Sequence, residues 1–404
     1  MSDIAFVACS KTKLPFAAPA GALYSSALFR KSLLTAYTNH DAVYVLSALH
    51  GILTLNKVIS PYDVTLKKMT RGERLDWSAL VEGQLASLVK AGDSVTFYCG
   101  DDYATPVRPI LARLNCVARE PLGRQSLGSR LRTLKSINRE TEVALMAQGA
   151  MREIKRLFRG QGGGRAFGDA AGNSGWPRKG VYIILDRVTG ERMPRVVRIG
   201  THAISSGSQS TLWNRLSTHR GTLDGRGSHR SSIFRSHVGH ALSRALRSSD
   251  WPSSWGVGQS ASLEIRSTEE AFERLVSEYI ATLQVIWLDI PDAAGPDSDR
   301  AYVEQNLIGL FSRCGYLSPG NHRDWLGERS PNWRIAGSGL WNLDHLFSLP
   351  DREAVDVIRQ YVDISLGKGA TPPASALAPK GWRLRRRARV SNQLSLLAGE
   401  VAGV

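Results

Sequence analysis

The chain is 404 residues long, and its 52 Lys and Arg residues outnumber 36 Asp and Glu residues to give a formal net charge of +16 at pH 7. A hydrophobic content of 42% is enough for two or three packed domains, and no apolar run is long enough to span a membrane. The excess positive charge indicates nucleic acid as the partner. Four cysteines without a Cys-x-x-Cys pair argue against a zinc knuckle or a disulfide framework and favour a cytoplasmic protein.

The first 140 residues have the pattern of an α/β domain. Helical patterns near residues 28–37 and 74–89 separate three apolar runs that read as strands, at residues 4–8, 43–46 and 95–98. Alternation of this kind predicts a Rossmann-like domain built on a parallel sheet.

Polar side chains replace the apolar pattern wherever one of these strands ends. Ligands of parallel sheets bind beyond the carboxyl ends of the strands, so the sequence predicts a pocket there. The candidate pocket residues are Cys9, Ser10, Lys11 and Lys13 after the first strand, His50 after the second, Asp101 and Tyr103 after the third, and Asp63 in a loop before a helix.

One interpretation of this pocket is that it holds a base turned out of the DNA stack. Asp63 or Asp101 would then stabilise a positively charged sugar during N-glycosidic cleavage, and His50 would donate the proton. The alternatives are structural: Asp63 caps the following helix, His50 is a turn residue, and Cys9 is a small buried residue.

Several segments of this region resemble the YaaA-related, DUF6884-like domain family. They are residues 9–13 (Cys-Ser-Lys-Thr-Lys), 23–26 (Leu-Tyr-Ser-Ser), 50–53 (His-Gly-Ile-Leu) and 61–63 (Pro-Tyr-Asp). The resemblance covers about residues 4–135. It implies a link to DNA binding and oxidative damage rather than a particular reaction, so we interpret residues 1–140 as a domain that recognises DNA or one of its bases.

Residues 141–178 are expected to join this domain to the next. An amphipathic helix over about 139–158 precedes a glycine-rich segment at 160–178, whose composition is typical of a flexible linker.

A hairpin and a helix with unusual charges begin the second domain. Residues 180–185 and 196–199 are rich in β-branched and aromatic residues and flank a polar turn, which predicts two paired strands. In the helical stripe that follows, Arg215 and His219 occupy two of the four positions expected to be apolar. Burying such groups without partners is costly, so we expect an anion against them. A later helix places Glu304 in line with Ile308 and Phe311, again a charge on an apolar face.

These segments resemble the GIY-YIG nuclease family, which implies an α+β nuclease domain over about residues 179–349. The resemblance is carried by Gly180-Val181-Tyr182, Arg198-Ile199-Gly200, Arg215 and the run from Glu304 to Ile308. The chain departs from the family pattern at Arg198, where a tyrosine is usual, and in a longer gap between the two strand motifs. The final asparagine of the family pattern is either Asn321 or Asn332.

The resemblance implies a metal-dependent nuclease whose roles fall on four side chains. Glu304 would hold Mg²⁺ or Mn²⁺, because a carboxylate suits a hard divalent ion. Arg215 would stabilise charge on the scissile phosphate. Tyr182 would act on the nucleophilic water once nearby cations favour its ionised form, and His219 would transfer a second proton or contact the phosphate. Singly, each has a structural alternative: a packed tyrosine, a hydrogen-bonded histidine or a solvated glutamate.

Further basic residues extend the expected contact with nucleic acid. Arg198 and Arg230 belong to the second domain. Region 350–404 is expected to contain a helix, a Gly- and Pro-rich break at 367–380, and a basic tail with Arg383, Arg385, Arg386 and Arg387. Trp382 would stack on a base, unless the tail is only a solvated basic segment.

We therefore expect a divalent-metal-dependent DNA endonuclease whose first domain recognises modified, damaged or foreign DNA in repair or phage defence. RNA is the alternative substrate. Two other functions stay open: a non-catalytic DNA-binding or sensing protein, which Arg198 in place of tyrosine favours, and a DNA glycosylase coupled to strand incision.

Overall fold

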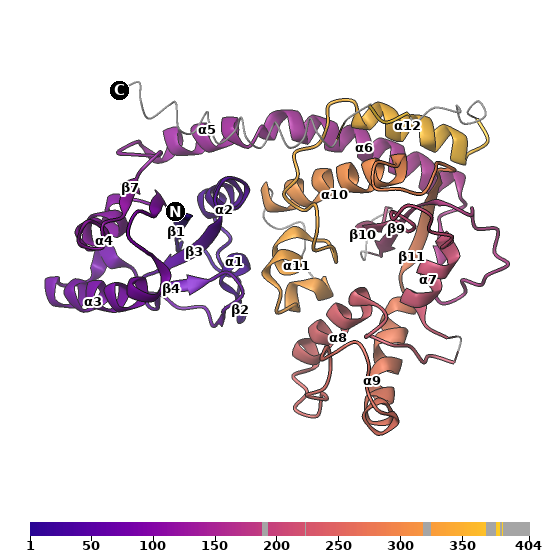
Figure 1. Cartoon of the computed structure of the whole chain (residues 1–404), viewed down its shortest axis with the longest axis horizontal. Coiled ribbons are helices and arrows are strands. Elements are labelled where there is room, and N and C mark those ends of the chain that lie inside the picture. Colours follow the sequence, from indigo (N-terminus) through magenta and orange to yellow (C-terminus); the bar gives the residue numbers. More distant parts are fainter. Residues whose placement is uncertain (188–192, 223, 318–324, 369–376, 380–381, 383–404) are drawn as a thin grey trace.

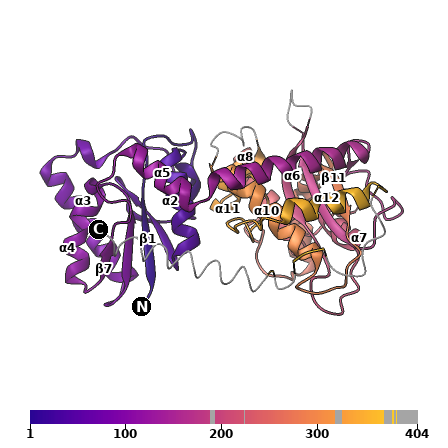
Figure 2. The ribbon, with the colours of Figure 1, turned by 90° about the horizontal axis from the view of Figure 1, so that it is seen from above.

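A computed structural model describes the chain except for residues 188–192, 223, 318–324, 369–376, 380–381 and 383–404; the side chains of 314–317 are also left undescribed. The chain forms two domains that lie side by side (Figure 1). The long helix α6 (Glu140–Gly160) leaves the first domain and runs along the second, as the view from above in Figure 2 shows.

The first domain contains a five-stranded sheet in the order β4-β3-β1-β6-β7. Its central strands confirm the predicted parallel sheet: β1 (Asp3–Ala8), β3 (Ala42–Ser47) and β6 (Ser94–Tyr98). The edges were not predicted. The parallel strand β7 (Val117–Arg119) is short and exposed, and β4 (Gly51–Thr54) returns antiparallel from a tight turn after β3.

Helices α2 (Ala27–Asn39), α3 (Arg71–Leu88) and α4 (Asp101–Arg113) connect these strands, and α5 (Leu127–Ile137) follows β7. The smaller elements are β2 (Ala18–Pro19), α1 (Ala20–Leu23), β5 (Val58–Ile59) and the 3-10 helix η1 (Leu66–Lys68). The start of α3 is fixed by a capping box in which Thr70 and Glu73 exchange hydrogen bonds.

The second domain is built on an antiparallel sheet in the order β10-β9-β11-β8. The predicted hairpin is present as β9 (Gly180–Asp186) and β10 (Arg195–Gly200), and β11 (Gln284–Asp289) pairs with the other side of β9. One face of the sheet packs against α6, α10 (Asp299–Leu317) and α12 (Ala354–Ser365). The opposite face is covered by α7 (Leu212–Arg220), α8 (Ile233–Leu246), α9 (Leu263–Ala281) and α11 (Trp333–Ser338).

The glycine-rich segment after α6 is folded, and the expectation of a flexible linker there is wrong. Strand β8 (Arg165–Ala166) pairs with β11, and the side chain of Phe167 is fully buried in the core of the second domain. Trp176 stacks on Trp213 of α7. The glycine content suggested flexibility, but the pairing of β8 and the burial of Phe167 order this segment.

Helix α11 joins the two domains, preceded by the 3-10 helix η2 (Leu326–Arg329). Its first residue, Trp333, packs in the hydrophobic core of the first domain. Trp333 also donates its backbone N–H to Asn56 (3.1 Å), and a Cβ at Gly21 would approach the indole ring to 2.9 Å. The domains are therefore packed on each other through a specific contact as well as joined by α6.

Candidate active site

Two glycines of the hairpin are required by close packing. A Cβ at Gly200, the last residue of β10, would lie 2.2 Å from the hydroxyl oxygen of Tyr182 on β9. A Cβ at Gly180 would lie 2.2 Å from the carbonyl oxygen of Leu288 on β11. The absence of a side chain at Gly200 lets the Tyr182 ring of β9 lie over the end of β10, and Gly180 lets β9 approach β11 closely.

The phenol of Tyr182 is the centre of a polar cluster inside the domain. Its oxygen lies 2.9 Å from Nε2 of His219 on α7, and it accepts a hydrogen bond from Nε of Arg198 on β10 (3.3 Å). All three side chains are buried, at 1%, 0% and 8% exposure. The predicted residues Tyr182 and His219 are thus brought together from segments far apart in the chain.

Arg198 occupies this cluster instead of a nucleic-acid-facing surface, which corrects the expectation for this residue. Nη1 donates to the carbonyl oxygen of Trp341 (2.8 Å), and the guanidinium lies over the ring of Phe234. The position where the family usually has a second tyrosine therefore supplies a fixed positive charge and a hydrogen-bond donor to the first one.

His219 is held from both ring nitrogens. Nδ1 lies 2.8 Å from Oγ of Ser232, whose oxygen also accepts the backbone N–H of Arg235 (3.3 Å). Burial, together with the charges of Arg198, Arg215 and Arg235, holds the pKa of His219 well below its usual value. The imidazole is therefore neutral at physiological pH and can pass a hydrogen bond from Ser232 to Tyr182.

Glu304 lies at the end of β10 next to this cluster. Its Oε1 accepts the backbone N–H of Thr201 (3.1 Å), the residue after Gly200. Burial raises the pKa of Glu304 to about 7, and the Thr201 hydrogen bond and the charges of Arg198 and Arg215 only partly offset this effect. Glu304 as a whole residue is half-buried, so solvent still reaches part of it.

A single carboxylate with access to solvent fits a hydrated divalent ion. Mg²⁺ commonly keeps several waters and is held by one or two carboxylates together with substrate phosphates. Within the described residues there is no group of three His, Cys, Asp or Glu side chains able to form a closed metal cage. Glu304 would therefore hold the ion jointly with the substrate.

We expect the affinity for Mn²⁺ to depend steeply on pH because of this raised pKa. Below about pH 7 the carboxyl group is protonated, and a proton must leave before the metal binds; above pH 7 this competition ends. The dissociation constant should rise about tenfold for each pH unit below 7. Calorimetric titration at several pH values checks this, and an affinity that stays constant from mildly acidic to neutral pH would contradict it.

Arg215 faces the same site from α7. Its guanidinium is partly exposed and has no hydrogen-bond partner in the described part of the chain, yet its charge acts on His219, Glu304 and His202. His202 accepts the N–H of Gly180 (3.3 Å) through Nε2. Burial and the charges of Arg300, Lys179 and Arg215 lower the pKa of His202 to about 4. An uncommitted guanidinium in such surroundings suits an incoming phosphate.

Asn342 is a site residue that the sequence reading missed. Its side chain accepts the N–H of Ile199 (3.1 Å) and donates to the carbonyl oxygen of the same residue (2.7 Å), which fixes β10 between Arg198 and Gly200. Asn332 instead caps α11 through the N–H of Arg334, and Asn321 lies outside the described residues. The Trp-Asn-Leu sequence after α11 was the available signal, but nothing in it indicates a partner on β10.

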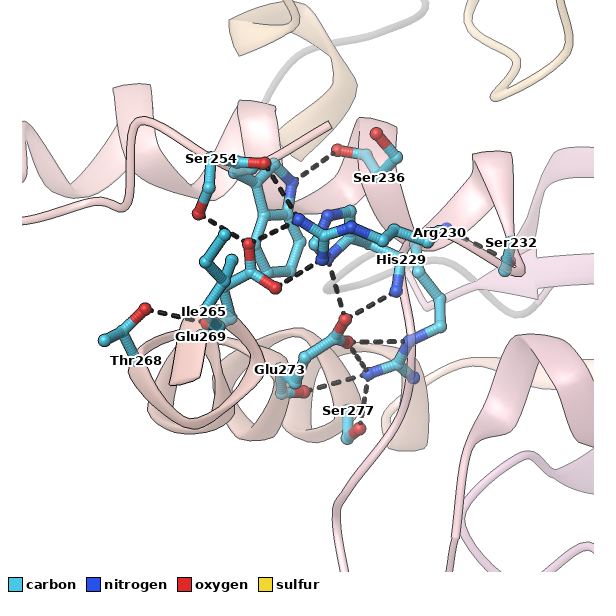
Figure 3. A network of polar contacts seen from close by, with 12 residues as sticks. His229, Arg230, Ser232, Ser236, Ser254, Ile265, Thr268, Glu269, Glu273 and Ser277 are labelled. Carbon is cyan, nitrogen blue, oxygen red and sulfur yellow. Dashed lines mark hydrogen bonds and ion pairs between the residues drawn. The ribbon is translucent and has the colours of Figure 1, made fainter. Parts of the chain in front are cut away.

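A buried network behind α7 supports the catalytic candidates (Figure 3). Arg235, with 0% exposure, donates from Nη1 to the carbonyl oxygens of His219 and Arg220 at the end of α7. Its other nitrogens donate to Glu273 on α9, which also accepts from His229. Burial raises the pKa of Glu273, but the hydrogen bonds and charges of His229 and Arg235 outweigh it, and the net pKa is lowered.

Arg230 belongs to the same network and is not available to nucleic acid, contrary to expectation. Its guanidinium has 6% side-chain exposure and forms a two-nitrogen ion pair with Glu269, whose second partner is Ser254. Figure 3 shows this pair beside His229 and Glu273. The charge is used to tie the loop before α8 to α9.

We expect Glu273→Ala to destabilise the protein by about 3–5 kcal/mol, because it leaves the buried Arg235 without its carboxylate. Glu270→Ala on the same helix is the matched control. Its pair with Arg274 is about half exposed, so the loss should be below about 0.5 kcal/mol. Urea unfolding of both variants measures the difference, and equal unfolding midpoints would refute the structural role of Glu273.

The predicted pocket of the first domain is present as a cavity of about 390 Å³. Its lining includes six of the eight predicted residues: Cys9, Ser10, Lys11, Lys13, Asp63 and Tyr103. His50 and Asp101 are not among the lining residues. His50 is the last residue of the turn after β3, as the structural alternative expected, and its backbone N–H donates to Ser47 Oγ (3.0 Å). Asp101 is exposed in the first turn of α4. Asp63 does not cap the α-helix that follows it, because the N-cap of α3 is Thr70.

The tail is described only in part. Trp382 is buried at 5% exposure against Tyr302, so it is not free to stack on a base as expected. Arg383, Arg385, Arg386 and Arg387 lie outside the described residues. None of the described helices is long and apolar enough to cross a membrane.

A glycine-bounded hairpin with a central tyrosine, a basic helix and a glutamate on a later helix define a nuclease domain that acts on phosphodiester bonds. The model of the GIY-YIG domain family matches residues 147–366, more than half of the chain, and the protein belongs to this family. Residues 4–136 match a family of unknown function, DUF6884. No curated protein and no solved structure matches the chain. The suspected fusion of these two domains is confirmed.

Proposed function

We propose that this nuclease is a DNA endonuclease that depends on Mg²⁺ or Mn²⁺. The observation that carries the proposal is the cluster of Tyr182, His219 and Arg198, which lies next to the half-buried Glu304. Close to this cluster, the guanidinium of Arg215 has no hydrogen-bond partner in the described part of the chain, which packing of the tyrosine alone does not explain.

Tyr182 would act as a phenolate, its own proton having passed to solvent, and would take a proton from the attacking water. When the Ser232 hydroxyl donates to Nδ1 of His219, Nε2 carries the imidazole proton and donates to the phenol oxygen. Arg198 donates to the same oxygen. Two N–H donors would then hold the phenolate oxygen in place for this step.

The remaining charges would act on the phosphate. A bound divalent ion polarises the scissile phosphate, and Glu304 is the residue that would hold it. Arg215 would neutralise charge that develops on the phosphoryl oxygens, since its guanidinium is not committed to a protein partner in the described part of the chain.

The first domain would recognise modified, damaged or foreign DNA, which fits a role in repair or phage defence. The net charge of +16 supports a nucleic-acid substrate. The alternative, a non-catalytic DNA-sensing protein, was favoured by Arg198. The contact of Arg198 with Tyr182 weakens that argument, because it gives the substituted residue a place in the cluster.

A cleavage screen tests the proposal. Supercoiled plasmid and duplexes that are plain, abasic, oxidised or hypermodified are incubated with Mg²⁺, Mn²⁺ or a chelator. We expect strand scission that requires the metal and is strongest on one class of altered DNA. DNA binding that weakens with salt, without scission under any metal, would establish the non-catalytic alternative instead.

A further inference from the structure

We propose that the cavity of the first domain is a nucleotide-binding site, with the phosphate placed between its lysines and the start of α2. This inference rests on the proposed recognition role only for the source of the nucleotide, which is either DNA or a free nucleotide. Binding in the cavity itself does not depend on DNA cleavage by the second domain.

The cavity lies at the topological switch point of the sheet. From β1 the chain passes through α2 to β3 on one side, and it later returns through α3 to β6 on the other side of β1. The residues that follow β1 and β6 therefore diverge and leave a crevice, where doubly wound sheets bind their ligands. Both sets line the cavity: Cys9, Ser10 and Lys11 after β1, and Cys99 and Gly100 after β6.

The charges around the cavity favour an anion. Four lysines (Lys11, Lys13, Lys67 and Lys68) line it, against two aspartates (Asp63 and Asp102). Helix α2 begins at the cavity wall with no acidic residue in its first turn. The Oγ of its cap, Ser26, accepts the N–H of Phe29, which leaves the two N–H groups before Phe29 free for a phosphate oxygen.

Ser32 is the independent sign of a missing ligand. It lines the cavity from α2 with 1% exposure, and its hydroxyl has no hydrogen-bond partner among the described residues. Leaving a buried hydroxyl without a partner is costly, so such groups are normally paired. A bound polar molecule in the cavity would supply the partner.

The rest of the lining suits a flat ring. Phe29, Tyr98 and Tyr103 contribute aromatic surface, and the Tyr103 hydroxyl lies 3.0 Å from Sγ of Cys9. Lys13 is fixed with its Nζ 4.4 Å from the ring centre of Tyr62, so its charge is held at the cavity rather than extended into solvent. Lysines, two unbonded N–H groups at the helix start and aromatic rings together match a nucleotide better than a bare anion.

Protection of Cys9 from alkylation tests the site in the full-length protein. Iodoacetamide labelling of Cys9 is followed by peptide mass mapping in the presence of AMP, GMP, CMP, dTMP, inorganic phosphate, or a duplex with one unpaired nucleotide. Cys116, which directly precedes β7 and does not line the cavity, is the internal reference. We expect at least one mononucleotide or the duplex to slow labelling of Cys9 but not of Cys116.

Two variants locate the ligand. Lys13→Met and Ser32→Ala should each weaken protection about tenfold, whereas Lys135→Met, an exposed lysine on α5, should leave it unchanged. Protection by mononucleotides identifies a free nucleotide as the ligand, and protection by the duplex alone identifies a nucleotide turned out of DNA. Equal protection by inorganic phosphate, or no protection by any probe, overturns the proposal. Loss of nuclease activity with intact protection would refute the cleavage mechanism and leave this site standing.

Discussion

Replacing Glu304 with Gln should lower the rate of metal-dependent DNA cleavage by on the order of 10³-fold, since metal stabilisation of the phosphoryl charge contributes several kcal/mol. The amide has nearly the same shape and can still accept the Thr201 N–H, but it lacks the charge that holds a divalent ion. The variant should therefore fold normally and fail mainly in catalysis. Initial rates of plasmid nicking over a range of Mn²⁺ concentrations measure the loss.

Glu278→Gln is the matched control for this variant. Glu278 is an exposed carboxylate on α9 in the same domain, so its neutralisation should leave nicking at the wild-type rate. If the two variants nick DNA equally fast, Glu304 is not the metal ligand and the assignment of the active site fails.

Replacing Tyr182 with Phe should reduce cleavage by about 10²–10⁴-fold, the usual contribution of a positioned general base. The ring remains to fill the core, where Tyr182 is 1% exposed, so the lost group is only the hydroxyl. His219 and Arg198 then lose the hydroxyl as a hydrogen-bond partner, and stability should fall by about 1–3 kcal/mol. Single-turnover cleavage at saturating metal separates this catalytic effect from metal binding.

Tyr361→Phe controls for the loss of a buried tyrosine hydroxyl. Tyr361 on α12 is 4% exposed and donates its hydroxyl proton to Asp299, so its variant should lose stability without losing catalysis. A Tyr182→Phe enzyme that cleaves as fast as Tyr361→Phe would show that another group takes the proton.

Much of the architecture could be predicted, because its strands either are buried on both faces or pair with a strand that is close in the sequence. The runs at β1, β3 and β6 are nearly all apolar, and β9 and β10 are bounded by a polar turn. Helix α4 could not be found in this way, because Pro106 and Pro109 lie inside it. Its amphipathic burial and tertiary packing outweigh the two prolines.

The sequence pointed to several residues that the structure brings together, but not to all of their partners. The off-pattern charges of Arg215, His219 and Glu304 lie on α7 and α10, and the structure places them near one another. The burial of Arg198 could not be foreseen, since its partner is a carbonyl oxygen on Trp341, distant in sequence. The same holds for Arg230, whose carboxylate partner lies on another helix. A basic residue read from sequence alone gives no sign of whether its counter-ion is a phosphate or a glutamate.

Because Trp333 of the second domain packs in the core of the first, we expect neither domain to be stable when it is expressed without the other. The second domain alone would expose the indole of Trp333 and the neighbouring ring of Phe347 to water. The first domain alone would have an unfilled apolar cavity next to Gly21, where the indole ring now packs. Replacing the first domain with that of another protein would succeed only if the replacement domain has a pocket that fits Trp333.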